Sequence, residues 1–257
     1  MMVIDTHCHL YVKEFENDIE QVITHAQQQG VQQFYLPNID SDSIEPMLQL
    51  EANYPGVCIA MMGLHPCSVK SDYKQQLQIA EGWLQKRKFA AVGEIGLDFY
   101  WDKSFEQQQF EAFRKQIELA LQNQLPIVIH SREAMQQCID VVSEYKGSGL
   151  TGIFHCFGGT VEEAERIIKL GFYLGIGGVL TYKKSGLTEV LKDISLEHLV
   201  LETDSPYLAP VPRRGKRNES AYLTYIIAAL ADIKNSTPGE VARITSANAT
   251  FVFQNHG

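Results

Sequence analysis

Short runs of apolar residues recur along the chain, most of them too brief and too rich in valine, isoleucine and phenylalanine for amphipathic helices. They predict eight buried β-strands, at Met2–Asp5, Gln33–Pro37, Cys58–Gly63, Phe89–Glu94, Pro126–His130, Thr151–His155, Phe172–Ile176 and Leu199–Glu202. The segments between them place apolar residues at helical spacing. This spacing predicts helices over Asp18–Gln29, Phe105–Leu121, Val161–Leu170, Ala221–Ile233 and Pro238–Phe253.

Short buried strands that alternate with helices favour a parallel sheet, and eight such units in 257 residues favour a (β/α)8 barrel. The alternative is an open, doubly wound sheet. A Rossmann fold of that kind would carry a Gly-rich nucleotide fingerprint after its first strand, and this sequence has none there. Because the chain contains no repeat, low-complexity tract or Pro/Ser-rich linker, we predict one α/β domain over residues 1–257.

Composition and charge narrow the class of protein. Hydrophobic residues make up 45% and charged residues 21% of the chain, and no apolar run approaches the ~20 residues of a membrane-spanning helix. The first residues show no secretory leader, and the five cysteines form no CxxC pair, so we expect a reduced, cytoplasmic protein. A formal net charge of −9 argues against binding nucleic acid through bulk charge, although it leaves room for a local basic patch.

Five of the eight histidines follow the ends of predicted strands, where a barrel places its active site. They are His7, His9, His65, His130 and His155. Alternate residues of a strand point to the same side, so His7 and His9 can bind one metal ion together. The alternative is a pair of hydrogen-bonded histidines inside the barrel mouth. The other three, His25, His198 and His256, are interpreted as surface or packing residues.

Two carboxylates also lie at strand ends. Glu94 is flanked by glycines after an apolar run, and burying it is costly unless it is paired or bound to a metal; a salt bridge to Arg132 is the alternative. Asp204 follows the eighth strand, where a carboxylate can bind a metal and accept a proton from water, or merely cap the Ser205-Pro206 turn. Histidines and carboxylates on one face favour two divalent ions bridged by a carboxylate.

The motifs, in this order, resemble those of the TatD family of metal-dependent deoxyribonucleases, within the amidohydrolase-like barrel superfamily. The resemblance covers essentially the whole chain. It rests on Asp5-Thr6-His7-Cys8-His9-Leu10, Gly63-Leu64-His65-Pro66, Gly93-Glu94-Ile95-Gly96-Leu97-Asp98, His130-Ser131-Arg132, His155-Cys156-Phe157-Gly158-Gly159, Glu202-Thr203-Asp204-Ser205-Pro206-Tyr207-Leu208-Ala209-Pro210 and Arg214-Gly215-Lys216-Arg217-Asn218.

The resemblance implies two divalent cations as cofactors, with Zn²⁺, Mg²⁺ and Mn²⁺ as the candidates. It implies that His7 and His9 bind one ion, that His130 and His155 bind the second, and that Glu94 bridges them.

It further implies that Asp204 is a ligand of the first ion and the base for the attacking water, and that His65 contacts the phosphate. Two positions depart from the family pattern. Tyr11 stands where members often have aspartate, and Cys67 stands where a second histidine is frequent.

The loop after the eighth strand has four basic residues within Arg213–Arg217 and is expected to overhang the barrel mouth. We predict that Arg214, Lys216 and Arg217 contact the phosphodiester backbone without reading bases, the alternative being a solvated loop. Aromatic side chains near the mouth stack on unpaired bases or simply pack at the rim. They are Phe99, Tyr100, Trp101, Phe157 and Tyr207.

The sequence therefore predicts a hydrolase that cleaves phosphodiester bonds of DNA, from an end or on single strands, without a membrane partner. The first alternative is another amidohydrolase-like activity, on a lactone, an amide or a phosphotriester. The second is a metal-dependent scaffold or nucleic-acid-binding module without catalysis, although such a protein has no need of the base that Asp204 would supply.

Overall fold

The protein is described by a computed structural model that covers residues 2–254. All neighbouring strands in it are parallel. One sheet has the order β1-β2-β3 and the other the order β4-β5-β6-β7-β8. Their bounds are β1 (Val3–Asp5), β2 (Val31–Leu36), β3 (Cys58–Ala60), β4 (Val92–Asp98), β5 (Ile127–Arg132), β6 (Gly152–Phe154), β7 (Phe172–Ile176) and β8 (Leu199–Leu201).

Two narrow seams join these sheets into a ring. Between β8 and β1, the backbone N–H of Thr6 donates to Leu201 O at 3.0 Å. Between β3 and β4, Met62 N donates to Ala91 O at 3.1 Å, and Met62 O accepts from Gly93 N at 3.0 Å. The strands thus follow one another in chain order around a (β/α)8 barrel, which confirms the predicted fold class.

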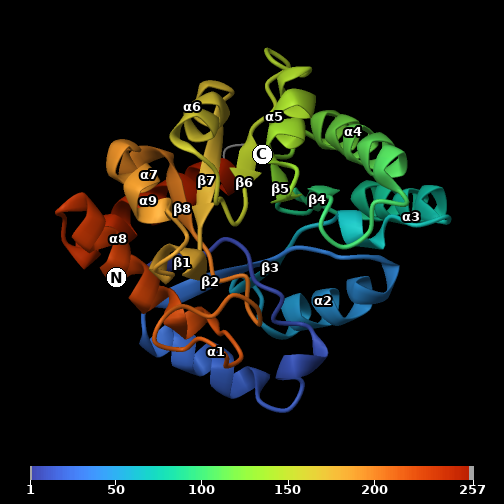
Figure 1. Ribbon diagram of the computed structural model, residues 1–257. Coiled ribbons are helices and arrows are strands. Elements are labelled where there is room, and N and C mark those ends of the chain that lie inside the picture. The colour runs from blue at the N-terminus through green and yellow to red at the C-terminus, as the bar shows by residue number, and fades with distance from the viewer. Residues whose placement is uncertain (1, 255–257) are drawn as a thin grey trace.

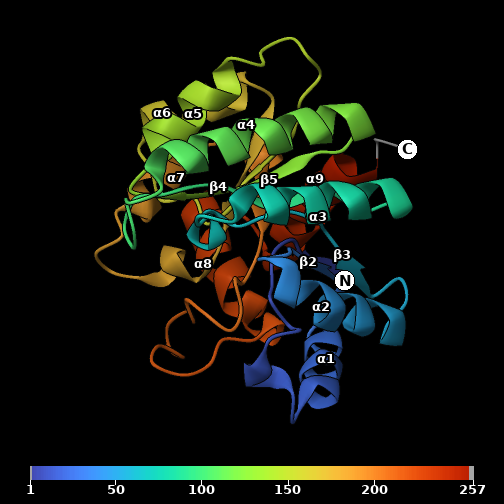
Figure 2. The same ribbon diagram turned by 90° about the vertical axis from the view of Figure 1, so that its right-hand side faces the viewer.

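Helices surround the strands in chain order (Figure 1). Figure 2 shows two of them, α3 and α4, side by side on the outside of the ring. Their bounds are α1 (Ile19–Gln28), α2 (Ser41–Asn53), α3 (Tyr73–Lys86), α4 (Glu106–Asn123), α5 (Met135–Ser143), α6 (Val161–Lys169), α7 (Leu187–Asp193) and α8 (Leu223–Lys234). Among the described residues, no helix is both long enough and apolar enough to cross a bilayer.

At one end of the ring, the inside is filled by one side chain from each strand or from a residue directly next to that strand in the sequence. These are Ile4, Tyr35, Met61, Ala91, Val128, Ile153, Tyr173 and Val200. The last helix, α9 (Pro238–Gln254), covers this layer, and its Phe253 ring stacks on Tyr35 with the ring centroids 3.9 Å apart. Asn248 of α9 donates to the carbonyl of Leu199, where β8 begins, so α9 closes the amino ends of the strands. The carboxyl ends remain for polar side chains.

The structure differs from the sequence-based prediction most at β4. The predicted strand ends at Glu94, whereas β4 continues to Asp98. Both carboxylates are only 2% exposed, because histidines from neighbouring strands contact them. The helices α2, α3, α5 and α7 have no counterpart among the predicted ones; in α2, for example, Pro46 and many polar residues obscure the apolar spacing.

Candidate metal centre

Histidines from three strand ends surround the carboxylate of Glu94, which projects from β4. Its Oε1 lies 2.8 Å from His130 Nδ1 and 3.2 Å from His155 Nε2. Its Oε2 lies 3.1 Å from His7 Nε2 and 3.5 Å from His9 Nε2. Burial alone would raise the pKa of Glu94, but the surrounding histidines lower it by more, so that the pKa lies well below its usual range. One carboxylate thus places each of its oxygens against a different pair of histidines.

Asp204 faces the first of these pairs from the loop after β8. Its Oδ1 lies 3.6 Å from His9 Nε2 and 3.8 Å from His7 Nε2, and its side chain is 15% exposed. Burial raises the pKa of Asp204 to about 6. The carboxylate is directed toward the histidines, and among the described residues it makes no hydrogen bond to the turn that follows it.

His65 presents an N–H group to the centre. It precedes the short helix η2 (Pro66–Ser68), and its Nδ1 accepts a hydrogen bond from Cys67 N at 3.0 Å. A neutral imidazole with an accepting Nδ1 carries its proton on Nε2. That Nε2 lies 3.4 Å from Glu94 Oε1. His65 therefore presents an N–H donor to the centre, whereas a metal ligand needs a lone pair there.

The tautomer of His9 is fixed by Tyr11. The Tyr11 hydroxyl donates to the carbonyl of Pro37 at 2.5 Å, and burial keeps the pKa of this hydroxyl well above its usual value. Its only proton is used in this bond, so it accepts from His9 Nδ1–H at 3.0 Å. The lone pair of His9 then lies on Nε2, the atom that faces Glu94 and Asp204.

A buried carboxylate orients His155 in the same way. Glu202 Oε1 lies 3.2 Å from His155 Nδ1 and also accepts from Cys156 N at 2.5 Å. Because a carboxylate only accepts, His155 carries a proton on Nδ1 and turns Nε2 toward Glu94. Glycine at position 175 makes room for this arrangement, since a Cβ there would lie 2.2 Å from Glu202 Oε2.

Asp98 contacts His130 as Glu202 contacts His155. Its Oδ2 lies 2.9 Å from His130 Nε2, and its Oδ1 accepts from the backbone N–H groups of Tyr100 and Trp101. Burial would lower the pKa of His130, but its hydrogen bonds to Asp98 and Glu94 raise it overall. Carboxylates of this outer layer orient the residues that bind a metal directly and increase their basicity.

Sequence reasoning assigned no role to Tyr11, Asp98 or Glu202. The two carboxylates do have a signal in the sequence, because each lies within four residues of Glu94 or Asp204 on the same strand end. Tyr11 has a weaker one, since it lies only two residues beyond His9, in a turn.

The arrangement of the potential ligand atoms fits divalent cations. His9 Nε2 lies 3.5 Å from Glu94 Oε2 and 3.6 Å from Asp204 Oδ1. All three atoms are hydrogen-bond acceptors, so no hydrogen bond can join them. In addition, the buried Nδ1 of His7 has no hydrogen-bond partner within residues 2–254. Ligand atoms of His7, His9 and Glu94, and likewise those of His7, His155 and Asp204, lie within 4.8 Å of one another. Imidazole and carboxylate ligands in this arrangement suit ions such as Zn²⁺ or Mn²⁺.

The predicted cationic residues lie in different environments. Arg217 forms a two-pronged ion pair with Asp18, at 2.8 and 2.6 Å, and donates to the carbonyl of Glu14. The Arg214 guanidinium lies 4.0 Å from the centroid of the Tyr182 ring. Lys216 is exposed and forms no ion pair among the described residues.

Arg132 does not pair with Glu94, which was the alternative reading of that carboxylate. Its guanidinium instead lies 3.8 Å from the centroid of the Tyr100 ring and 5.2 Å from that of Trp101.

Replacing Tyr11 with phenylalanine is expected to weaken binding of the ion at His7 and His9 by about 10–100-fold, because His9 loses the acceptor that keeps its lone pair on Nε2. Equilibrium dialysis against Mn²⁺ or Zn²⁺ measures the effect without any substrate. Tyr207→Phe is the matched control, because the Tyr207 ring also lies beside His9, at 6.2 Å between centroids, but no hydrogen bond from its hydroxyl to His9 is present. Equal affinities in the two variants would contradict the role of Tyr11.

Comparison with known proteins places this centre in a family. A family model described as TatD related DNase matches residues 4–254. The metal-dependent hydrolase YabD of Bacillus subtilis is 37% identical over 254 residues, covering 98% of this chain and 99% of that protein. A Yersinia pseudotuberculosis protein named 3'-5' ssDNA/RNA exonuclease TatD is 32% identical over 247 residues, covering 94% and 95%. The crystal structure of the TatD homologue YjjV from Escherichia coli has a TM-score of 0.92 at 30% identity, covering 98% and 97%. The chain therefore belongs to the TatD-related DNase family of metal-dependent hydrolases.

Proposed function

We propose that this protein hydrolyses phosphodiester bonds of single-stranded DNA near an end, using divalent cations bound around Glu94. The observation that carries this proposal is the rim of the centre. Five large apolar side chains are exposed on the loops after β4 and β8. Arg214 and Lys216, two basic side chains of the loop after β8, have no carboxylate partner among the described residues. The five apolar side chains are Tyr100, Trp101, Tyr207, Leu208 and Val211. Unpaired bases stack on such aromatic surfaces, and the name of the Yersinia relative agrees with this substrate.

The side chains of the centre divide the chemistry among them. A divalent cation held there would act as a Lewis acid that lowers the pKa of water, and its positive charge would balance the negative charge of a phosphodiester. Asp204 accepts the proton of the attacking water, a role that fits a carboxylate ionised above a pKa of about 6. His65 donates its Nε2–H to a phosphoryl oxygen, since its tautomer leaves a donor facing the centre.

The basic loop positions the strand. Arg214 and Lys216 are exposed and are the proposed contacts to the phosphodiester backbone. We assign Arg217 an anchoring role in the same loop, because its guanidinium already binds Asp18 and the Glu14 carbonyl, and a phosphate contact would require it to leave them.

Metal removal tests the proposal directly. Protein stripped with a chelator is expected to lose hydrolysis of end-labelled single-stranded DNA by at least 100-fold, because the charge balance at the phosphate is lost. Mg²⁺, Mn²⁺ and Zn²⁺ added back one at a time then identify the ions that restore it. Duplex DNA, an aryl ester and a panel of lactones are assayed beside the single strand. Turnover of a lactone or ester without turnover of DNA would assign the centre to the alternative activity.

A further inference from the structure

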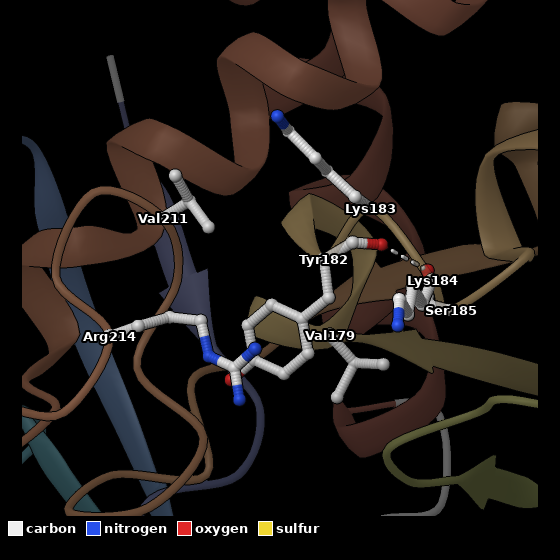
Figure 3. A pocket seen from close by; sticks show the side chains of 7 residues that line it. All are labelled: Val179, Tyr182, Lys183, Lys184, Ser185, Val211 and Arg214. Carbon is white, nitrogen blue, oxygen red and sulfur yellow. Dashed lines mark hydrogen bonds between the residues drawn. The ribbon is translucent and has the colours of Figure 1, made fainter.

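A cleft at the carboxyl end of the barrel lies between the loops that follow the last two strands. It has a volume of about 520 Å³ and is lined by Val179, Tyr182, Lys183, Lys184, Ser185, Val211 and Arg214 (Figure 3). This volume is within the ~300–1,000 Å³ typical of pockets for small ligands. From this set, the proposed function above uses only Val211 and Arg214.

The two walls of the cleft are bonded to each other. The Tyr182 hydroxyl donates to the carbonyl of Ala209 at 3.0 Å, and Val211 N donates to Thr181 Oγ1 at 2.8 Å. Gly178 packs so closely on the second loop that a Cβ would lie 2.1 Å from the Leu208 carbonyl oxygen. The cleft is thus a preformed feature, and its walls come from the same end of the barrel as Asp204.

Tyr182 connects the cleft with the metal centre. Its hydroxyl donates to Ala209, in the loop that begins at Asp204. Burial raises the pKa of this hydroxyl, although the nearby Arg214 guanidinium lowers it in part. Gly177 begins the loop that leads to Tyr182, and a Cβ there would lie 3.7 Å from Cγ of Glu202, the carboxylate that contacts His155. The loop that forms one wall of the cleft therefore also packs against the centre.

The chemistry of the lining is that of a nucleotide site. Val179, Tyr182 and Val211 provide apolar surface, and the Arg214 guanidinium lies over the Tyr182 ring (Figure 3). A guanidinium plane supported by an aromatic ring has a second face on which a base can stack. Lys183 extends away from the ring. Both lysines are exposed and form no ion pair among the described residues, in a chain of net charge −9.

We propose that this cleft holds a nucleotide of single-stranded DNA adjacent to the bond being cleaved, with its base on the Tyr182–Arg214 pair and its phosphates against Lys183 and Lys184. This inference rests on the proposed function and extends it to a second part of the substrate. In barrels of this class, the loops after the seventh and eighth strands often bind phosphate groups, which agrees with the placement.

The test measures binding and turnover separately. Binding of a fluorescent 12-nucleotide single strand with phosphorothioate linkages, which slow hydrolysis, is followed by anisotropy on the metal-loaded protein. Lys183→Ala/Lys184→Ala is expected to weaken binding about 10-fold and to reduce the slope of log Kd against log salt by ~1.4, for two lost phosphate contacts on a single strand. Arg214→Lys keeps the charge but loses the planar surface, and is expected to cost about 10-fold as well.

A second basic cleft provides the matched control. It has a volume of about 380 Å³ and contains the exposed Lys86 and Lys88, and it lies before β4 and β5, at the opposite end of the barrel. Lys86→Ala/Lys88→Ala is expected to bind the oligonucleotide as the wild type does. If all the variants share the wild-type Kd, or if the wild type does not bind the strand, the inference is wrong.

A small chromogenic phosphodiester, bis(p-nitrophenyl) phosphate, separates this inference from the proposed function. It has no neighbouring nucleotide, so its hydrolysis is expected to change less than 2-fold in the lysine variant, while the KM for the oligonucleotide rises about 10-fold. Absence of hydrolysis of both substrates at saturating metal would overturn the proposed function, whereas equal effects of the lysine variant on both would overturn the cleft.

Discussion

Asp204→Asn is expected to lower kcat for DNA hydrolysis by about 10²–10⁴-fold, the usual consequence of losing a general base, while most of the metal stays bound. Asparagine keeps an oxygen that can coordinate an ion but cannot accept a proton at neutral pH. It also tolerates the positive φ of 55° at this position, so that the backbone is not strained by the change. The measurement is kcat at saturating metal, with metal content determined on the same sample.

Asp98→Asn is the control for this prediction. Asp98 contacts His130 and no other histidine of the centre, so its replacement is expected to weaken metal binding and to be rescued by raised metal concentration. Asp204→Asn is not expected to be rescued in this way. Activity of Asp204→Asn within a few-fold of the wild type would return Asp204 to the role of a turn residue.

Glu94→Gln is expected to abolish metal binding at both pairs of histidines. Each carboxylate oxygen of Glu94 faces its own pair of histidines, at 2.8–3.2 Å and 3.1–3.5 Å. An amide replaces one of these oxygens by an NH₂ donor, and it removes the negative charge that would stabilise cations bound at either pair of histidines. Metal analysis after gel filtration is expected to find less than one tenth of the wild-type content, in a protein whose circular dichroism is unchanged.

Glu202→Gln makes the same chemical change in a buried carboxylate that contacts His155 but no other histidine of the centre. It is expected to lower the affinity of one ion by about 10–100-fold and to leave the other in place. Loss of a single ion from Glu94→Gln, with the second bound at full affinity, would contradict a bridging position for Glu94.

The sequence predicted the barrel well because its strands are buried on both faces. Each strand then becomes a continuous apolar run, as in Ile127–Ile129 of β5, and such runs are visible without any knowledge of contacts. The same signal fails where a strand carries chemistry. β4 continues through Glu94 and Asp98, and only the histidines of other strands explain how these carboxylates are buried.

The candidate site could be predicted only as a set of residues at strand ends. Which nitrogen of His9 or His65 faces the centre depends on Tyr11, Pro37 and Cys67, through hydrogen bonds that no spacing rule describes. The pairing of Arg217 with Asp18 joins positions 199 residues apart, and a pattern of basic residues along one loop contains no trace of it. Local periodicity predicts the helices and strands, whereas the hydrogen-bond and ion-pair partners of a side chain depend on the assembled barrel.

The seam between β1 and β8 sets the time at which this protein can become active. Thr6 and Leu201 are bonded across 195 residues, and Thr203 donates to Asp5 beside them. His7 and His9 follow β1 and Asp204 follows β8, so the centre cannot be completed until the chain has been made through the loop after β8. Closing so long a loop costs entropy, which metal binding to the finished ring would help to offset. Ions are therefore expected to load at the end of maturation, and a nascent chain arrested before β8 is expected to retain none.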